Sequence, residues 1–116
     1  MKFLCLAYGD GKDWTALTKE EQDQLLAQDQ SIRDRGALMA AVEPTVTTVR
    51  AWNGQPPSTM PEPVAPLIAP LAGFSVIEAE SLTEVIQLVS KTPCAYAKGA
   101  IEIRPILSID NAGPAG

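Results

Sequence analysis

Apolar residues recur along this chain with two spacings, one typical of strands and one typical of helices. Residues 2–8 (KFLCLAY) are almost continuously apolar and stop at a Gly-Asp-Gly turn, which indicates a central strand covered on both faces. Near the end of the chain, AIEIRPI alternates apolar with charged residues, which indicates a half-buried strand. The further predicted strands span residues 37–43, 45–52, 73–79 and 100–106.

Capping boxes mark two helix starts, because a hydroxyl residue followed three positions later by glutamate satisfies free backbone N–H groups. The first box is Thr18 with Glu21, and its helix is predicted to end at Gly36. This helix carries a narrow apolar stripe made of Leu25, Leu26 and Ile32. One face should therefore cover a sheet while the polar remainder meets water.

The second box is Ser81 with Glu84, and its helix is predicted to end at Thr92-Pro93. The residues expected to face inward are Leu82, Val85, Ile86, Leu88 and Val89.

Between the predicted strands lies a proline-rich segment that follows Asn53-Gly54, a strong tight-turn signal. Six prolines fall within residues 55–71, and each removes a backbone donor from any ladder. The segment is predicted to be a loop or at best an irregular edge. Four apolar residues are expected to anchor it: Val64, Leu67, Ile68 and Leu71.

The order strand, helix, strand, strand, loop, strand, helix, strand favours an α+β fold with a ferredoxin-like antiparallel sheet and two helices on one face. Residues 1–107 are expected to form one domain, and residues 108–116 a flexible C-terminal tail. Two helices leave the second sheet face uncovered. A second copy of the chain is its simplest cover, so we expect a homodimer.

Net charge limits the classes of binding partner, and the cysteines indicate the redox compartment. The formal net charge is −5 and no run of Lys or Arg occurs, which argues against nucleic acid and against an anionic membrane surface. No stretch is long and apolar enough for a membrane helix. Cys5 and Cys94 are far apart, and we interpret them as reduced thiols of a cytoplasmic protein, with a disulfide or redox role as the alternative.

Several segments, taken in order, resemble the YCII-related domain family and specifically its DGPF branch. They are MKFLCLAYGD, the capped polar helix ending at Gly36, TTVRAWNG and GAIEIRPI, so the resemblance runs from Met1 to about Ile106. The resemblance implies a ferredoxin-like fold that pairs into a dimeric α+β barrel with a cavity. It implies no defined reaction, although relatives of the branch are often linked to extracytoplasmic-function sigma factors.

Two departures from the family pattern bear on chemistry. Where the branch carries Asp-Gly-Pro-Phe, this chain reads Met60-Pro61-Glu62-Pro63. The wider family has been suspected of catalysis through a His-Asp pair, and this chain has no histidine. That chemistry therefore transfers to no position here.

Without histidine, a general base must be a carboxylate, lysine, tyrosine or cysteine with a shifted pKa. Asp10, after the first strand, is the candidate carboxylate, and a turn residue bonding its own backbone is the alternative. The run from Gly9 to Trp14 begins like a dinucleotide fingerprint but has Trp14 in place of the third glycine. A dehydrogenase is therefore disfavoured.

Arginines and aromatic residues near the strand ends suggest a ligand site. Arg50 and Arg104 are candidates for binding an anion, with ion pairs to Glu43 or Glu102 as the alternative. The complete candidate ligand site is Tyr8, Asp10, Trp14, Arg50, Trp52 and Arg104. No residue pattern indicates a metal site, and we expect no cofactor.

Two functional hypotheses follow. The first is a non-catalytic homodimeric module that binds a small ligand, with an anion among the candidates, or a protein partner. The second is a small enzyme that uses a carboxylate on an anionic or carbonyl-containing metabolite. A closed cavity lined by both an arginine and a carboxylate of perturbed pKa would favour the second.

Overall fold

A four-stranded antiparallel sheet lies at the centre of the structure, a computed structural model that describes residues 1–109. Its strands are β1 (Lys2–Tyr8), β2 (Leu38–Ala41), β5 (Leu71–Glu78) and β6 (Ala100–Pro105), in the spatial order β2-β5-β1-β6. Every neighbouring pair is antiparallel, so β1 and β2 run in the same direction with β5 between them. This is the predicted ferredoxin-like sheet.

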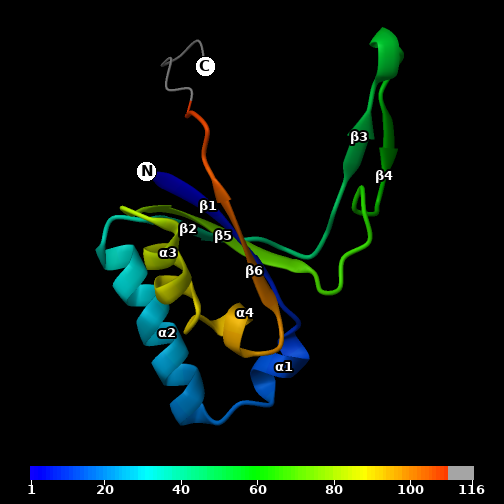
Figure 1. The fold of residues 1–116 in the computed structure, drawn as a ribbon. Coiled ribbons are helices and arrows are strands. Elements are labelled where there is room, and N and C mark those ends of the chain that lie inside the picture. The colour runs from blue at the N-terminus through cyan, green and yellow to red at the C-terminus, as the bar shows by residue number, and fades with distance from the viewer. Residues whose placement is uncertain (110–116) are drawn as a thin grey trace.

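Four helices lie on one side of this sheet (Figure 1). They are α1 (Gly11–Thr15), α2 (Lys19–Asp34), α3 (Leu82–Val89) and α4 (Pro93–Tyr96). The predicted capping box at Thr18 and Glu21 is present and begins α2, while Ser81 caps α3. No helix among residues 1–109 is long and apolar enough to cross a membrane.

The core lies between the sheet and the two longer helices. Phe3 and Cys5 of β1 are buried there against Ile77 of β5, Ile32 of α2 and Val85 of α3. These strand residues alternate with outward-facing neighbours, because successive side chains of a strand point to opposite faces of the sheet. Burial of this cluster is the main force that holds the helices on the sheet.

The helical predictions need three corrections. The second helix ends at Val89, and Thr92-Pro93 does not stop it but begins α4, because proline is well suited to the first turn of a helix. Leu82 and Ile86 are each 48% exposed rather than inward. Leu26, assigned to the apolar stripe of the first helix, is also exposed.

A second, two-stranded sheet projects from the sheet-and-helix body (Figure 1). It consists of β3 (Thr48–Arg50), a 3-10 turn η1 (Trp52–Gly54) and β4 (Ser58–Met60). We call residues 48–60 the arm and residues 1–41 with 71–106 the body. The arm rises on the side of the sheet opposite the helices. The radius of gyration is 16.4 Å, against about 13 Å for a compact chain of this length.

The arm corrects the prediction for residues 55–71. A returning strand, β4, does form there, with Thr48 opposite Met60 and Arg50 opposite Ser58. It occupies one of the two stretches of the segment in which three residues in a row contain no proline, residues 58–60, and residues 67–69 are the other. Of the expected apolar anchors, Leu71 joins β5, whereas the other three are exposed: Val64, Leu67 and Ile68.

The sheet face opposite the helices carries apolar side chains that nothing in the described chain covers fully. Leu4 and Leu6 of β1 and Phe74 and Val76 of β5 alternate with the buried residues and are half-buried. Leu38, at the edge on β2, is 60% exposed. We call this surface the open face.

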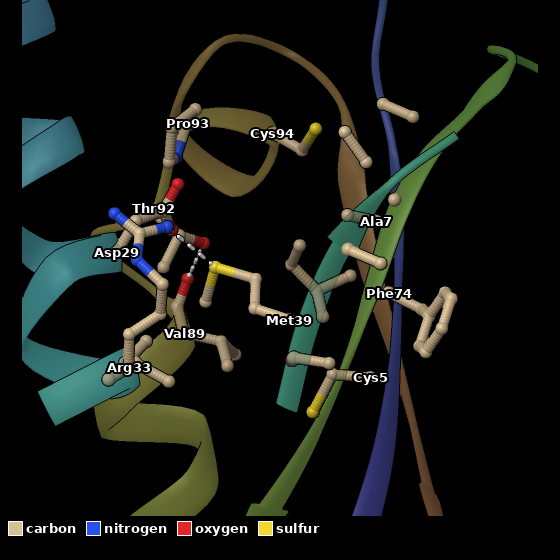
Figure 2. A pocket seen from close by; sticks show the side chains of 17 residues that line it. Cys5, Ala7, Asp29, Arg33, Met39, Phe74, Val89, Thr92, Pro93 and Cys94 are labelled. Carbon is tan, nitrogen blue, oxygen red and sulfur yellow. Dashed lines mark hydrogen bonds between the residues drawn. The ribbon is translucent and has the colours of Figure 1, made fainter. Parts of the chain in front are cut away.

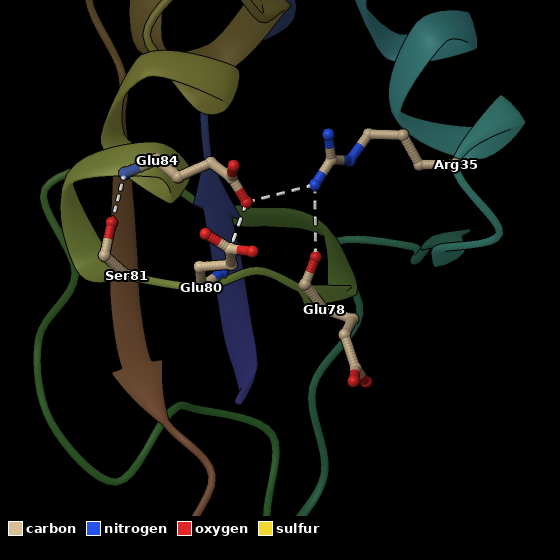
Figure 3. A network of polar contacts seen from close by, with 5 residues as sticks. All are labelled: Arg35, Glu78, Glu80, Ser81 and Glu84. Atoms are coloured by element: carbon tan, nitrogen blue, oxygen red, sulfur yellow. Dashed lines mark hydrogen bonds and ion pairs between the residues drawn. The ribbon is translucent and has the colours of Figure 1, made fainter.

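Polar contacts connect the elements at one end of the body (Figure 3). The Arg35 guanidinium, just after α2, donates to the Glu78 carbonyl and to Glu84 Oε1, at 3.2 Å each. Glu84 lies in α3, and its carboxylate also accepts from the backbone of Glu80. The three elements α2, β5 and α3 are thereby joined at the end of the body where Glu78 ends β5.

Candidate functional site

A cavity of about 260 Å³ lies between the sheet and the helices (Figure 2). It exists because the strand residues that face the helices at this end of the sheet are small: Ala7, Gly73 and Ser75. Farther along the same strands, Phe3 and Ile77 fill the corresponding space. The cavity is partly open to solvent and is lined mainly by apolar groups, as ligand sites usually are.

Asp29 supplies a carboxyl group to this cavity from α2. The helical repeat places it on the same face as the buried residues Leu25 and Ile32. Burial raises the pKa of the Asp29 carboxyl, and the nearby Arg33 guanidinium opposes that rise. The carboxyl oxygens of Asp29 are not fully buried, because no buried side-chain oxygen among residues 1–109 lacks a hydrogen-bond partner.

Arg33, one helical turn later, brings a positive charge to the same cavity. Its Nε and Nη2 donate to Gln30 Oε1 at 3.2 and 2.8 Å, which holds the guanidinium against α2. Its Nη1 donates to the Met39 sulfur at 3.2 Å, across to β2 (Figure 2). The cavity therefore holds a carboxyl group and a guanidinium within an otherwise apolar surface.

Both cysteines line the cavity as free thiols. Burial raises the pKa of Cys5, although a hydrogen bond with Ser75 lowers it in part. Burial also raises the pKa of Cys94, and the negative charge of Asp29 adds to that rise. A thiol with a raised pKa stays protonated near neutral pH and is a poor nucleophile, so the thiols contribute apolar wall rather than reactivity.

The sequence-based site residues occupy three separate places. Tyr8 and Arg104 meet on the open face, where the Tyr8 hydroxyl donates to Glu102 Oε1 at 2.8 Å. Glu102 also pairs with Arg104 at 3.5 Å, so for this arginine the ion pair is present. The hydrogen bond with Glu102 raises the pKa of Tyr8.

Asp10 and Trp14 line a second hollow of about 220 Å³ beside α1. The Asp10 carboxylate accepts from the Lys12 backbone N–H at 2.9 Å and caps α1, which is the local bonding that the turn interpretation requires. Pro93 and Cys94 line both hollows, so the two are neighbours across the start of α4.

Arg50 and Trp52 lie together on the arm, away from both hollows (Figure 1). The Arg50 guanidinium lies 5.2 Å from the centroid of the Trp52 ring, within range of a cation–π interaction. Trp52 is 69% exposed. Within residues 1–109 no single hollow collects the six predicted ligand residues, and no group of acidic or thiol side chains is arranged to bind a metal ion.

Asp29 and Arg33 were absent from the sequence-based site, although a signal for Asp29 was available. Leu25, Asp29 and Ile32 follow the spacing of one helix face, so a carboxylate lies within the apolar stripe. A charged residue in such a stripe either turns toward a cavity or costs stability. The predominantly polar composition of the helix concealed this position.

Comparisons with known proteins agree with this fold. The model of the YCII-related domain matches residues 1–110, so the chain belongs to the YCII-related domain family. A solved structure with a similar fold is "5-chloro-2-hydroxyhydroquinone dehydrochlorinase (TftG)" from Burkholderia phenoliruptrix AC1100, in complex with 2,5-dihydroxybenzoquinone. It has a TM-score of 0.51 and 16% sequence identity, and the match covers 91% of this chain and 93% of that one. No curated protein matches the sequence.

Proposed function

We propose that this chain is a homodimeric module that binds a small molecule in the cavity between its sheet and its helices. The observation that carries the proposal is the half-buried carboxyl group of Asp29, which lines an otherwise apolar hollow together with the Arg33 guanidinium. Ligand sites are typically apolar hollows in which a few polar groups fix the orientation of the ligand. The cavity volume suits a ligand of about one ring.

Filling the cavity tests ligand binding. Ala7 faces the cavity from β1, so the Ala7→Leu variant should lose binding of small aromatic probes such as benzyl alcohol. Binding is measured from the methyl NMR signals of the methionines, since Met39 lines the cavity. The matched control is Ala27→Leu on the exposed side of α2. Equal binding by both variants would place the ligand elsewhere.

The homodimer rests on the open face, where half-buried apolar residues from β1 and β5 adjoin the exposed Leu38. A contiguous apolar surface of this kind is typical of an interface. In a symmetric dimer, a second copy would cover this surface with the same residues of its own open face. We expect a dimer at micromolar concentration in sedimentation. Leu6→Glu should give a monomer, whereas Leu26→Glu, an exposed leucine on the helical side, should remain dimeric.

A second candidate is an enzyme that transfers a proton to or from a carbonyl-containing metabolite. The specific support is that a carboxyl with a raised pKa and an arginine line one cavity together, as a general base and an anion-binding group would. The residue that would carry the chemistry is then Asp29 rather than Asp10. The similarly folded dehydrochlorinase, which binds a hydroxylated quinone, shows that this fold accommodates an enzyme.

Solvent-proton exchange separates the two candidates. An enzyme of the second kind should incorporate deuterium from heavy water into the methyl group of pyruvate, because the base removes a proton from the carbon beside the carbonyl and returns a deuteron. Asp29→Asn should abolish the exchange while pyruvate still binds. Binding without exchange in the unmodified protein would favour the non-catalytic module.

A further inference from the structure

No residue among residues 1–109 forms an ion pair with the guanidinium of Arg33. Its three hydrogen bonds go to neutral acceptors, the Gln30 amide oxygen and the Met39 thioether. Among residues 1–109, the ion pairs involve other cations: Lys19, Arg35 and Arg104. Asp29 is close enough to feel the charge but forms no ion pair with it within 4.0 Å.

The contact with Met39 is the weak one of the three. A thioether sulfur is a poor hydrogen-bond acceptor, whereas a guanidinium binds carboxylate and other anionic oxygens strongly and often through two parallel bonds. The two bonds to Gln30 hold Nε and Nη2 against α2 and leave Nη1 directed at Met39, on the β2 side of the cavity (Figure 2). An anionic oxygen at that position would replace the sulfur at little cost.

The remaining lining limits the charge of the ligand. Arg33 is the one basic residue that lines the cavity, and Asp29 is the one acidic residue. A dianion would place a second negative charge beside the Asp29 carboxyl, which like-charge repulsion disfavours. The strand side offers only small or apolar groups, including Ala7 and Gly73.

We propose that Arg33 is the anion-recognising residue of this cavity, that Met39 is its resting partner, and that the ligand is a small, mostly apolar monoanion. This inference rests on the proposed ligand binding and adds the chemical class of the ligand. The anionic oxygen lies on Nη1 of Arg33 in place of the Met39 sulfur, and a second polar atom of the ligand meets the carboxyl of Asp29.

Benzoate and benzyl alcohol test the inference as an anion and a neutral molecule of similar size. We expect benzoate to bind at least tenfold more tightly. Arg33→Leu should weaken benzoate binding about tenfold and leave benzyl alcohol within twofold, while Arg33→Lys should restore part of the loss. Lys19→Leu is the charge-matched control, because Lys19 lies exposed on the same helix and does not line the cavity.

The methyl NMR signals of the methionines report directly whether a ligand replaces the Met39 sulfur as the partner of Arg33. The Met39 signal should move when benzoate binds and should move less in Arg33→Leu, whereas Met60 on the arm should stay unchanged. Equal affinity for the two probes, or equal losses of both in Arg33→Leu, would overturn the role of Arg33 but not the cavity as a ligand site. Failure of both probes to shift Met39 would overturn the proposed ligand binding as well.

Discussion

In the body, β1 is paired along both edges and buries Phe3 and Cys5, whereas in the arm each strand is paired along one edge and Val49 is 59% exposed. Both regions have the backbone hydrogen bonds of antiparallel sheet, so the type of pairing does not distinguish them. The difference is the apolar area that each removes from water. Isolated two-stranded sheets are marginally stable, so the arm needs a surface to pack on if it is to be as well ordered as the body.

The open face offers such a surface, because the arm rises on the same side of the sheet (Figure 1). A second copy that covers the open face would also approach the arm. The stability of the body is therefore contained within one chain, whereas the stability of the arm depends on the proposed dimer.

The largest expected effect is the loss of stability in the body, compared with a matched substitution in the arm. Ile77→Ala should lower the free energy of unfolding by about 2 to 5 kcal/mol, because this side chain is completely buried and its removal leaves a cavity. Val49→Ala in the arm should cost less than about 1 kcal/mol. Urea denaturation monitored by circular dichroism measures both. A cost for Val49→Ala that rivals the cost of Ile77→Ala would show that the arm is buried in solution.

An intermediate effect is expected where β2 and β5 approach each other. A Cβ at Gly73 would lie 2.5 Å from the Ala40 carbonyl oxygen, so Gly73→Ala should push the strands apart and cost about 1 to 3 kcal/mol. Gly11→Ala is the control, because nothing lies within 4 Å of the added methyl group. Thermal unfolding compares the two. If Gly73→Ala unfolds at the temperature of the unmodified protein, the strands tolerate separation and the body is less rigid than its packing implies.

The smallest expected effect concerns pH. Because burial raises the pKa of Asp29 in the folded protein, the folded state favours its protonated form, and the associated stability is lost as pH rises through that pKa. Asp29→Asn keeps this position uncharged, so it should match the unmodified protein at about pH 3 and be more stable at about pH 7. The gain should stay below about 1 kcal/mol, since Asp29 is partly exposed.

Asp23→Asn is the control for the pH series. Asp23 is exposed on the same helix and pairs with Lys19, so its removal should give no gain at neutral pH. A gain of equal size in both variants would mean that the net charge of the protein, rather than burial of Asp29, is responsible.

Much of the body could be predicted from the sequence because its signals are local. The capping box at Thr18 and the single cap at Ser81 place both longer helices, and the alternation of Ile101 and Ile103 with charged residues gives the face pattern of β6. Cys5 and Cys94, interpreted as reduced thiols, are free in the structure. The two short helices were missed because each spans about one turn and depends on a single residue, Asp10 or Pro93.

The candidate site was harder to predict than the fold. A cavity arises from what several distant segments lack, and the small residues Ala7, Gly73 and Ser75 carry no signal individually. Tyr8 and Asp10 were chosen because strand ends often carry function, and Arg104 because it lies on an alternating strand. Alternation directs Tyr8 and Arg104 to the face opposite the cavity. Strand position was predictable, whereas the layer in which the cavity forms was not.

The position of β1 in the sheet also has a consequence for how the chain folds. β1 precedes both of its neighbours by a long stretch of chain, since they begin at Leu71 and Ala100. Its ladders therefore close long loops, which slows folding relative to chains rich in local contacts. Until β5 emerges from the ribosome, KFLCLAY is an apolar segment of strand-forming residues without proline and without a pairing partner. We expect newly made chains to be most prone to aggregation in this interval, and chaperones that bind short apolar segments to recognise β1 before β5 is made.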